Sequence, residues 1–252
     1  MIKLFISDID GCISEPFTTP NWDLLAQVRR LNEQSRQDMA VPPLTLCSGR
    51  PMPYVEAVAQ WLHVDLPCVF ESGGIYELES NRVEFLSSFD EEAERQITDL
   101  KKWLDEEIIP QYSDMVIEFT KKMDAGIIHL DTEIIDELCP IFEDYVDEHY
   151  PRFEVHKTEI SINIILKNNN KGAGISKLCE LIDVSPDEVA YIGDSSGDIP
   201  GLGVVGHAFA PQNAADIVKE KAEVLDASVT DAVLMAYRRI IQHNRKVLAE
   251  VG

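Results

Sequence analysis

The feature that most constrains the fold is a recurring order in which a short apolar run ends at a polar, glycine-containing turn and a helical segment follows. Residues 2–7 form the first such run, the turn Asp8–Gly11 ends it, and apolar residues at helical spacing follow at 24–31. Strands that alternate with helices predict an α/β fold, a doubly wound and mostly parallel sheet that binds ligands at the carboxyl ends of its strands. The elements expected for this sheet are strands at 2–7, 44–47, 189–192 and 204–208, and helices at 24–31, 55–62, 172–182 and 233–248.

Between residues 81 and 167 the order of the predicted elements changes to helix, strand, strand, and this order occurs twice. Pro140 falls inside the second helical segment and is expected to kink or split it. The pattern predicts a small α+β cap domain at 81–167, inserted into a core made of 1–80 and 168–252. Its expected elements are helices at 97–108 and 134–145, a hairpin of strands at 115–120 and 126–130, and closing strands at 152–156 and 161–166.

Charge limits the partners of this chain. Its 252 residues contain 22 Lys and Arg against 45 Asp and Glu, a formal net charge of -23. Such a protein is repelled by nucleic acid and by anionic lipid, so neither is an expected partner. An acidic protein that handles an anionic phosphate needs a bound cation and a few placed basic residues.

The five cysteines form no CxxC pair and no metal-ligand spacing, which indicates reduced thiols and a cytoplasmic location. No apolar run reaches the roughly 18 residues of a membrane-spanning helix. The oligomeric state has no signature in the sequence.

Two carboxylates lie in the turn that follows the first strand, at Asp8 and Asp10, with Gly11 behind them. A turn at a strand end can direct both towards one ligand, so that one attacks phosphorus while the other transfers a proton. A plain β-turn is an equally good interpretation of this segment alone.

A second acidic turn, with Asp194 and Asp198, follows the strand at 189–192. Magnesium is commonly bound by one or two carboxylates together with phosphate oxygens and water, so this turn is a candidate Mg²⁺ site. A simple turn or helix cap is the alternative, which weakens because both acidic turns fall at strand ends of one sheet.

Ser48, Gly49 and Lys171 are candidate phosphate-binding residues. Ser48 and Gly49 offer a hydroxyl and a backbone N–H at the start of a helix, where anions are favoured. Lys171 stands at the start of another helix, where the helix dipole disfavours a cation. Taken singly, the first pair reads as a helix cap and Lys171 as a surface lysine.

Together these four segments resemble the haloacid dehalogenase-like (HAD) hydrolase superfamily, and the match runs across most of the chain. The insert looks like the cap of sucrose-phosphate, mannosyl-3-phosphoglycerate and archaeal phosphoglycolate phosphatases. The motifs that carry the resemblance are Asp8-x-Asp10-Gly11, Ser48-Gly49-Arg50, Lys171-Gly172, and Gly193-Asp194 with Asp198.

The resemblance implies that Asp8 is the nucleophile and that Asp10 first protonates the leaving oxygen and then activates water. It implies that Ser48 and Lys171 hold the phosphoryl group. Magnesium would be ligated by Asp194, by the Asp8 carboxylate and by the Asp10 carbonyl, while Asp198 would ligate it or orient its waters. Arg50, the last residue of the second motif, is a candidate contact for a substrate anion, and an ion pair with the acidic surface is the equal alternative.

Two positions depart from the family pattern. Cys12 stands where many relatives have threonine, which bears only on the geometry of the first loop. Glu71–Gly74 stands where relatives often have an asparagine-glycine pair, which puts substrate contacts from that loop in doubt.

A dinucleotide-binding fingerprint also occurs, as Gly201-x-Gly203-x-x-Gly206. A true fingerprint joins a strand to a helix, whereas here a strand follows the last glycine. We therefore do not expect this segment to bind a dinucleotide.

The sequence thus predicts a magnesium-dependent phosphatase that hydrolyses a small phosphorylated metabolite, either a sugar phosphate or a phosphoglycolate-like acid. A phosphomutase of the same superfamily and a non-catalytic phospholigand-binding protein remain as alternatives. In the cap, Glu159 and Asn163 are candidates to face the substrate, although the sequence does not say which side of their strands faces inward.

Overall fold

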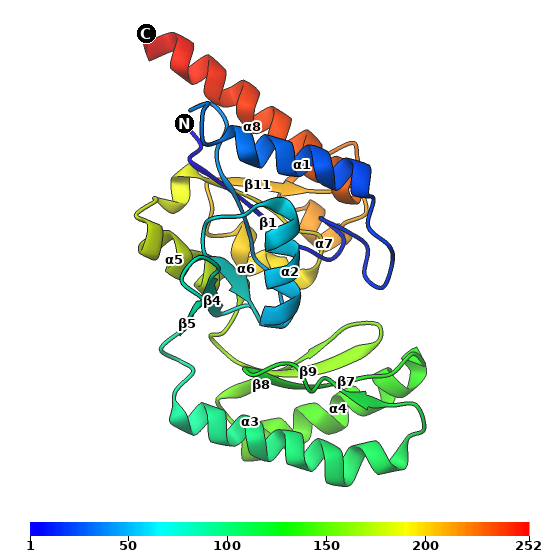
Figure 1. The fold of residues 1–252 in the computed structure, drawn as a ribbon. Helices are drawn as coiled ribbons and strands as arrows, with labels where there is room; N and C mark the ends of the chain where they lie inside the picture. Colours follow the sequence, from blue (N-terminus) through cyan, green and yellow to red (C-terminus); the bar gives the residue numbers. More distant parts are fainter. Residues whose placement is uncertain (252) are drawn as a thin grey trace. The chain divides into compact units, whose positions relative to one another are not determined.

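The computed structural model describes residues 1–251, which divide into two compact units (Figure 1). One unit consists of Met1–Glu84 and of the chain from Asn170 onward, and the other of Phe85–Asn169. Each unit contains its own cluster of buried apolar side chains. The two units are therefore described separately.

The first unit is built on a five-stranded sheet in which every neighbouring pair is parallel. The strand order is β12-β11-β10-β1-β2, with Ser7 of β1 opposite both Ile192 of β10 and Leu46 of β2. The predicted parallel sheet is confirmed. Its strands are β1 (Leu4–Ser7), β2 (Leu44–Leu46), β10 (Val189–Ile192), β11 (His207–Ala210) and β12 (Glu223–Val224).

Helices cover both faces of this sheet. Leu4 and Ile6 pack in one cluster with Ile175 of α5, whereas Phe5 points to the opposite face, where its ring centre lies 5.1 Å from that of Tyr237 in α8, with the ring planes tilted by 59°. Figure 1 shows α1 running beside α8. The helices of this unit are α1 (Trp22–Gln34), α2 (Met52–Leu62), α5 (Lys171–Ile182), α6 (Ile199–Leu202), α7 (Asp216–Lys219) and α8 (Val229–Val251), with short 3₁₀ turns at Pro186–Glu188 and Ser196–Asp198.

A small sheet of three strands, which the sequence analysis does not anticipate, follows α2 in the order β3-β4-β5. The turn between its first two strands places Glu71 and Ser72 at positive φ, 44° and 62°. Strands of three or four residues are too short for a clear alternation of apolar and polar residues. The strands are β3 (Cys68–Phe70), β4 (Gly74–Glu77) and β5 (Arg82–Phe85).

The second unit is an antiparallel sheet, in the order β6-β7-β9-β8, with α3 and α4. Its order of helix, two strands, helix, two strands agrees with the sequence-based expectation. The elements are α3 (Glu91–Trp103), a π-helical turn (Leu104–Ile108), a 3₁₀ turn (Ile109–Gln111), β6 (Val116–Ile117), β7 (Asp124–Ile128), α4 (Thr132–His149), β8 (Phe153–Lys157) and β9 (Ser161–Leu166).

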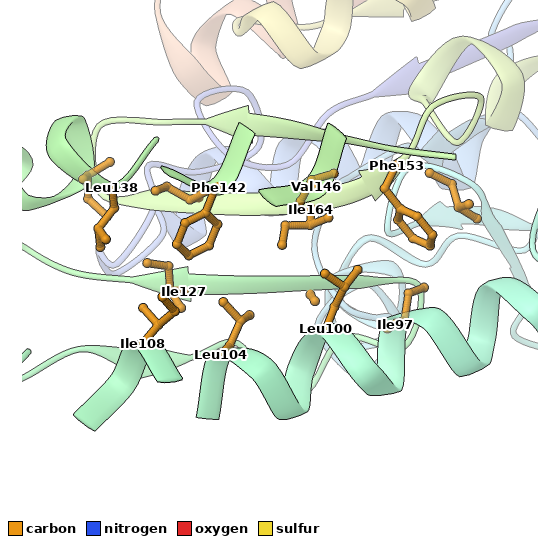
Figure 2. Packing of buried hydrophobic residues seen from close by; sticks show 14 of the residues in the cluster. Ile97, Leu100, Leu104, Ile108, Ile127, Leu138, Phe142, Val146, Phe153 and Ile164 are labelled. Carbon is orange, nitrogen blue, oxygen red and sulfur yellow. The ribbon is translucent and has the colours of Figure 1, made fainter. Parts of the chain in front are cut away.

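Apolar side chains from both helices form the core of this unit. Figure 2 shows Ile97 and Leu100 of α3, Phe142 of α4, and Ile127 and Ile164 of the strands converging in one layer. The inward strand positions alternate, as expected for a sheet with one apolar face.

Several element boundaries differ from those predicted. The strand expected at 204–208 begins only at His207, and the hairpin strands are Val116–Ile117 and Asp124–Ile128 in place of 115–120 and 126–130. Of the two expectations for Pro140, a kink or a split, the split is wrong, because α4 runs without a break from Thr132 to His149. Leu138 and Phe142, on either side of this proline, are buried in the core, and that packing offsets the lost backbone hydrogen bond.

Within residues 1–251, no helix has both the length and the apolar character that crossing a membrane would require.

Candidate active site

The first unit gathers its polar turns at one edge of the parallel sheet. Asp8 directly follows β1, Ser48 lies just beyond β2, and Asp194 lies just beyond β10. Because these three strands are parallel neighbours in register, their carboxyl ends coincide. Three turns separated by up to 186 residues in the chain therefore share one location.

Lys171 lies at the centre of this cluster. The side chain of Asn170 caps α5 by accepting from the Ala173 N–H at 3.1 Å, and Lys171 is the first residue of that helix. The Lys171 Nζ lies 2.9 Å from Asp8 Oδ1 and 2.6 Å from Asp198 Oδ1. These two carboxylates explain how a cation is tolerated at the positive end of a helix.

The lysine is charged although it is buried. Burial by itself lowers the pKa of Lys171, but the carboxylates of Asp198 and Asp8 outweigh it and hold the pKa well above its ordinary value. The site thus contains a buried positive charge that pairs with these two carboxylates.

At Asp8, in contrast to Lys171, the effect of burial on the pKa exceeds that of the oppositely charged partner. Burial raises the pKa of the Asp8 carboxyl well above its ordinary value, the neighbouring Asp198 and Asp194 raise it further, and Lys171 only partly opposes them. The group of three carboxylates contains one ammonium group, which pairs with Asp8 and Asp198, so the site has an excess of negative charge that a metal cation would neutralise.

The same carboxylates form a candidate metal site. Asp8, Asp194 and Asp198 each offer an oxygen, and these oxygens lie within 4.8 Å of one another. Burial and the nearby Asp198 raise the pKa of Asp194 to about 7. A set of carboxylate oxygens beside the Lys171 ammonium group fits Mg²⁺, which prefers oxygen ligands.

Gly11 makes the close approach of Asp194 possible. This glycine has φ +71°, and a Cβ at its position would lie 2.0 Å from Asp194 Oδ2. Any side chain here would displace the Asp194 carboxylate and strain the backbone. The Gly11 carbonyl also accepts from Asn213 Nδ2 at 2.9 Å, which ties the first loop to the segment after β11.

Asp198 receives five hydrogen bonds and is fully buried. Its Oδ2 accepts from the N–H of Asp194 at 3.1 Å, and from the N–H and the hydroxyl of Ser195, both at 2.9 Å. Its Oδ1 accepts from Lys171 and from the Tyr191 hydroxyl. Burial alone would raise the pKa of Asp198, but Lys171, Tyr191 and Ser195 together lower it.

Asp10 lies at the exposed side of the cluster and pairs with Arg50. The guanidinium group binds both carboxylate oxygens, with Nε to Oδ2 at 2.6 Å and Nη2 to Oδ1 at 2.9 Å. The central carbon of the guanidinium group, Arg50 Cζ, lies 5.3 Å from the ring centre of Phe17 and 5.1 Å from that of Tyr54. These contacts fix the direction of the guanidinium group.

Ser48 and Gly49 complete the arrangement beside β2. Ser48 is buried, and its Oγ accepts from the Arg50 N–H at 3.1 Å. A Cβ on Gly49 would meet only Ser72 Oγ, at 3.7 Å, which is ordinary van der Waals contact. The segment after β2 thus supplies a hydroxyl and a peptide group at the edge of the sheet where the other polar turns lie.

Sequence reasoning overlooked two residues of this site. Tyr191 lies inside an apolar strand, where a tyrosine looks like ordinary core, and Asn213 lies after β11, outside the four motifs. The pairing of Asp10 with Arg50 was also missed. A motif shows which residues are present but does not show their partners.

The comparison with protein families identifies the class of hydrolase to which the chain belongs. A model described as haloacid dehalogenase-like hydrolase matches residues 104–236, slightly more than half of the chain. The chain therefore belongs to the haloacid dehalogenase-like hydrolases.

Curated relatives lie within the phosphatases. The chain is 26% identical over 238 residues to a phosphoglycolate phosphatase of Methanococcoides burtonii, covering 94% of this chain and 95% of that protein. It is also 26% identical to a phosphoglycolate phosphatase of Methanopyrus kandleri, with 96% and 98% covered. Together with the family, these relatives support a phosphatase that acts on a small phosphorylated substrate.

Solved structures share the fold. A Thermoplasma acidophilum protein superimposes with a TM-score of 0.74 at 18% identity, covering 95% of this chain and 98% of that chain. The sucrose-phosphatase of Synechocystis, solved with sucrose and phosphate, gives 0.65 at 15% identity, with 94% and 97% covered. These likenesses confirm the predicted mixed α/β architecture.

Proposed function

We propose that this protein is an Mg²⁺-dependent phosphatase that hydrolyses a small phosphomonoester through an aspartyl phosphate on Asp8. The observation that carries the proposal is the position of Asp8, with its Oδ1 2.9 Å from Lys171 Nζ and within a group of three carboxylates. A nucleophilic carboxylate divides a difficult phosphoryl transfer into two easier steps.

In the first step an Asp8 oxygen forms a bond to phosphorus while the ester P–O bond breaks, and Asp10 gives its proton to the leaving alkoxide. In the second step water attacks the same phosphorus, Asp10 takes a proton from it, and orthophosphate leaves with Asp8 restored. The partly exposed position of Asp10, on the outer side of the cluster, supports this proton-transfer role, which requires access to the leaving group and to water.

Other residues of the site hold the phosphoryl group. Lys171 supplies a buried positive charge, and Ser48 and Gly49 supply a hydroxyl and an N–H at the end of β2. Mg²⁺, held by Asp8, Asp194, the Asp10 carbonyl and, directly or through its waters, Asp198, would neutralise the phosphate oxygens. The five donors on Asp198 favour the indirect role for that residue.

The substrate proposed is a short phosphorylated acid, with sugar phosphates as the second class to test. The names of the relatives from Methanococcoides and Methanopyrus support this choice. The planar fork of Arg50, the candidate contact for a substrate anion, is engaged by both carboxylate oxygens of Asp10.

The two units fit different tasks in this proposal. The unit that carries Asp8 and Lys171 serves as the catalytic core, as proposed for 1–80 and 168–252, and the insert at 81–167 serves as a cap that selects the leaving group. The free state of all five cysteines supports a cytoplasmic location. The net charge of -23 supports a small-molecule substrate over a nucleic acid or membrane partner.

The test is a phosphate-release assay of the purified protein with Mg²⁺ on a panel of phosphorylated acids and sugars, with EDTA as the metal-free control. We expect turnover of at least one phosphorylated acid and none by Asp8→Asn with an unchanged circular dichroism spectrum. Turnover that requires a sugar bisphosphate would instead identify a phosphomutase. Binding of phosphorylated ligands without any turnover would identify a non-catalytic protein, and equal turnover by Asp8→Asn would exclude the proposed nucleophile.

A further inference from the structure

A fully buried tyrosine lies directly behind the candidate active site. Tyr191 belongs to β10, and its hydroxyl donates to Asp198 Oδ1. That oxygen is the one that also accepts from Lys171 Nζ, at 2.6 Å. Tyr191 and Lys171 therefore share one acceptor atom.

Two glycines provide the space for this contact. A Cβ on Gly201 would lie 2.8 Å from the Tyr191 ring, and a Cβ on Gly193 would lie 2.4 Å from Asp198 Cγ. Gly201 is the first glycine of the sequence that resembles a dinucleotide fingerprint. Its place against Tyr191 gives that glycine a packing role in this site.

The geometry points to Tyr191 as a positioning residue that holds the Asp198 carboxylate in the orientation that aims Lys171 at the transferring phosphoryl group. Three loop donors fix Asp198 Oδ2, and the tyrosine hydroxyl adds the one rigid donor on the Oδ1 side. A lysine side chain is long and flexible, so the direction of its ammonium group depends on such anchors.

The hydrogen bond from Tyr191 to Asp198 matters most during the reaction. Lys171 has two anionic partners, Asp8 and Asp198, and the proposed nucleophile must turn from the lysine to phosphorus. Asp198 then remains as the protein partner of Lys171. The inference rests on the proposed function, because it assigns Lys171 to the phosphoryl group.

The test compares Tyr191→Phe with Tyr237→Phe, each of which removes one buried hydroxyl and keeps the ring. Tyr237 is also fully buried in the first unit, and its hydroxyl donates to the Pro42 carbonyl at 2.6 Å, in α8 and outside the site. We expect both variants to lose a similar amount of stability in urea, since each leaves one buried acceptor short of a donor.

Kinetics separate the two variants. Tyr191→Phe should lower kcat about tenfold and raise the inhibition constant of orthophosphate about tenfold, because the loss of a hydrogen bond to a charged group misplaces Lys171. Tyr237→Phe should leave both constants within about twofold of wild type. A smaller folded fraction would lower kcat without changing that inhibition constant, so the inhibition constant distinguishes positioning from a merely structural role.

Identical kinetics for the two variants would overturn the inference. If the wild-type protein hydrolyses no phosphomonoester, the proposed function fails on its own. Calorimetric binding of orthophosphate with Mg²⁺ to the wild type and both variants still tests Tyr191 in that case: weaker binding only by Tyr191→Phe supports the inference, and equal binding by all three overturns it.

Discussion

Arg50 binds both carboxylate oxygens of Asp10, at 2.6 and 2.9 Å, across a separation of 40 residues in the chain. The two residues lie in loops that follow the neighbouring strands β1 and β2. An arginine fork on both oxygens fixes the plane of the carboxylate as well as its position. The group proposed to transfer protons is thus oriented before any substrate arrives.

Replacing this arginine tests that orientation. Arg50→Lys keeps the charge but loses the fork, so we expect kcat/KM to fall about tenfold, and Arg50→Ala should lower it further. The measurement is steady-state phosphate release at saturating Mg²⁺. Arg36→Ala is the matched control, because Arg36 makes a similar pair with Asp65 on the exposed surface, and it should leave kcat/KM unchanged. Equal activity of Arg50→Ala and the wild type would contradict the assignment.

The crowding of negative charge predicts an effect on stability. Burial and the nearby Asp198 and Asp194 raise the pKa of Asp8, so its charged form is unfavourable in the metal-free fold. Asp8→Asn removes that charge, and we expect it to be more stable than wild type at pH 8 by about 1 kcal/mol or more. Urea unfolding in EDTA measures the difference. A less stable variant would mean that the ion pair with Lys171 outweighs the repulsion.

Asp194 should make metal-free stability depend on pH. Its pKa of about 7 in the fold exceeds the ordinary value of 3.8, so the folded state binds more protons than the unfolded state between these values. The Asp194 contribution to stability therefore falls as pH rises through this window, and the penalty is complete above pH 7. The difference in unfolding midpoint between wild type and Asp194→Asn in EDTA should shrink from pH 8 to pH 5. An unchanging difference would refute this account.

Gly11 offers a test of the metal site. In Gly11→Ala the new Cβ meets Asp194 at 2.0 Å and the backbone is held at φ +71°, so we expect Mg²⁺ affinity measured by calorimetry to fall at least tenfold. Gly197→Ala is the control in the neighbouring acidic loop, where a Cβ would meet only Ser195 Oγ at 3.7 Å. If both variants bind Mg²⁺ like wild type, Asp194 does not hold the metal as proposed.

Much of the architecture could be predicted because strand-turn-helix signals are local. The strands predicted before Asp8 and before Asp194 are confirmed, since an apolar run that ends at a polar, glycine-containing turn is typical of a buried strand. Element boundaries are predicted less accurately. The strand β11 starts only after Gly206, where an added Cβ would lie 2.2 Å from the Asp187 carbonyl oxygen. Hydrophobic periodicity does not reveal such a close backbone contact. The helix through Pro140 continues because its packed face compensates for one missing donor.

The amino-acid order by itself determined the alternation of strands and helices and the polar residues at the strand ends, because periodicity and turn chemistry act over a few residues. Only the tertiary structure decided that Lys171 lies between Asp8 and Asp198, that Arg50 binds Asp10, and that Tyr191 supports Asp198. Most of these contacts join residues far apart in the chain, and all depend on how strands pair and side chains pack, which local sequence signals do not encode.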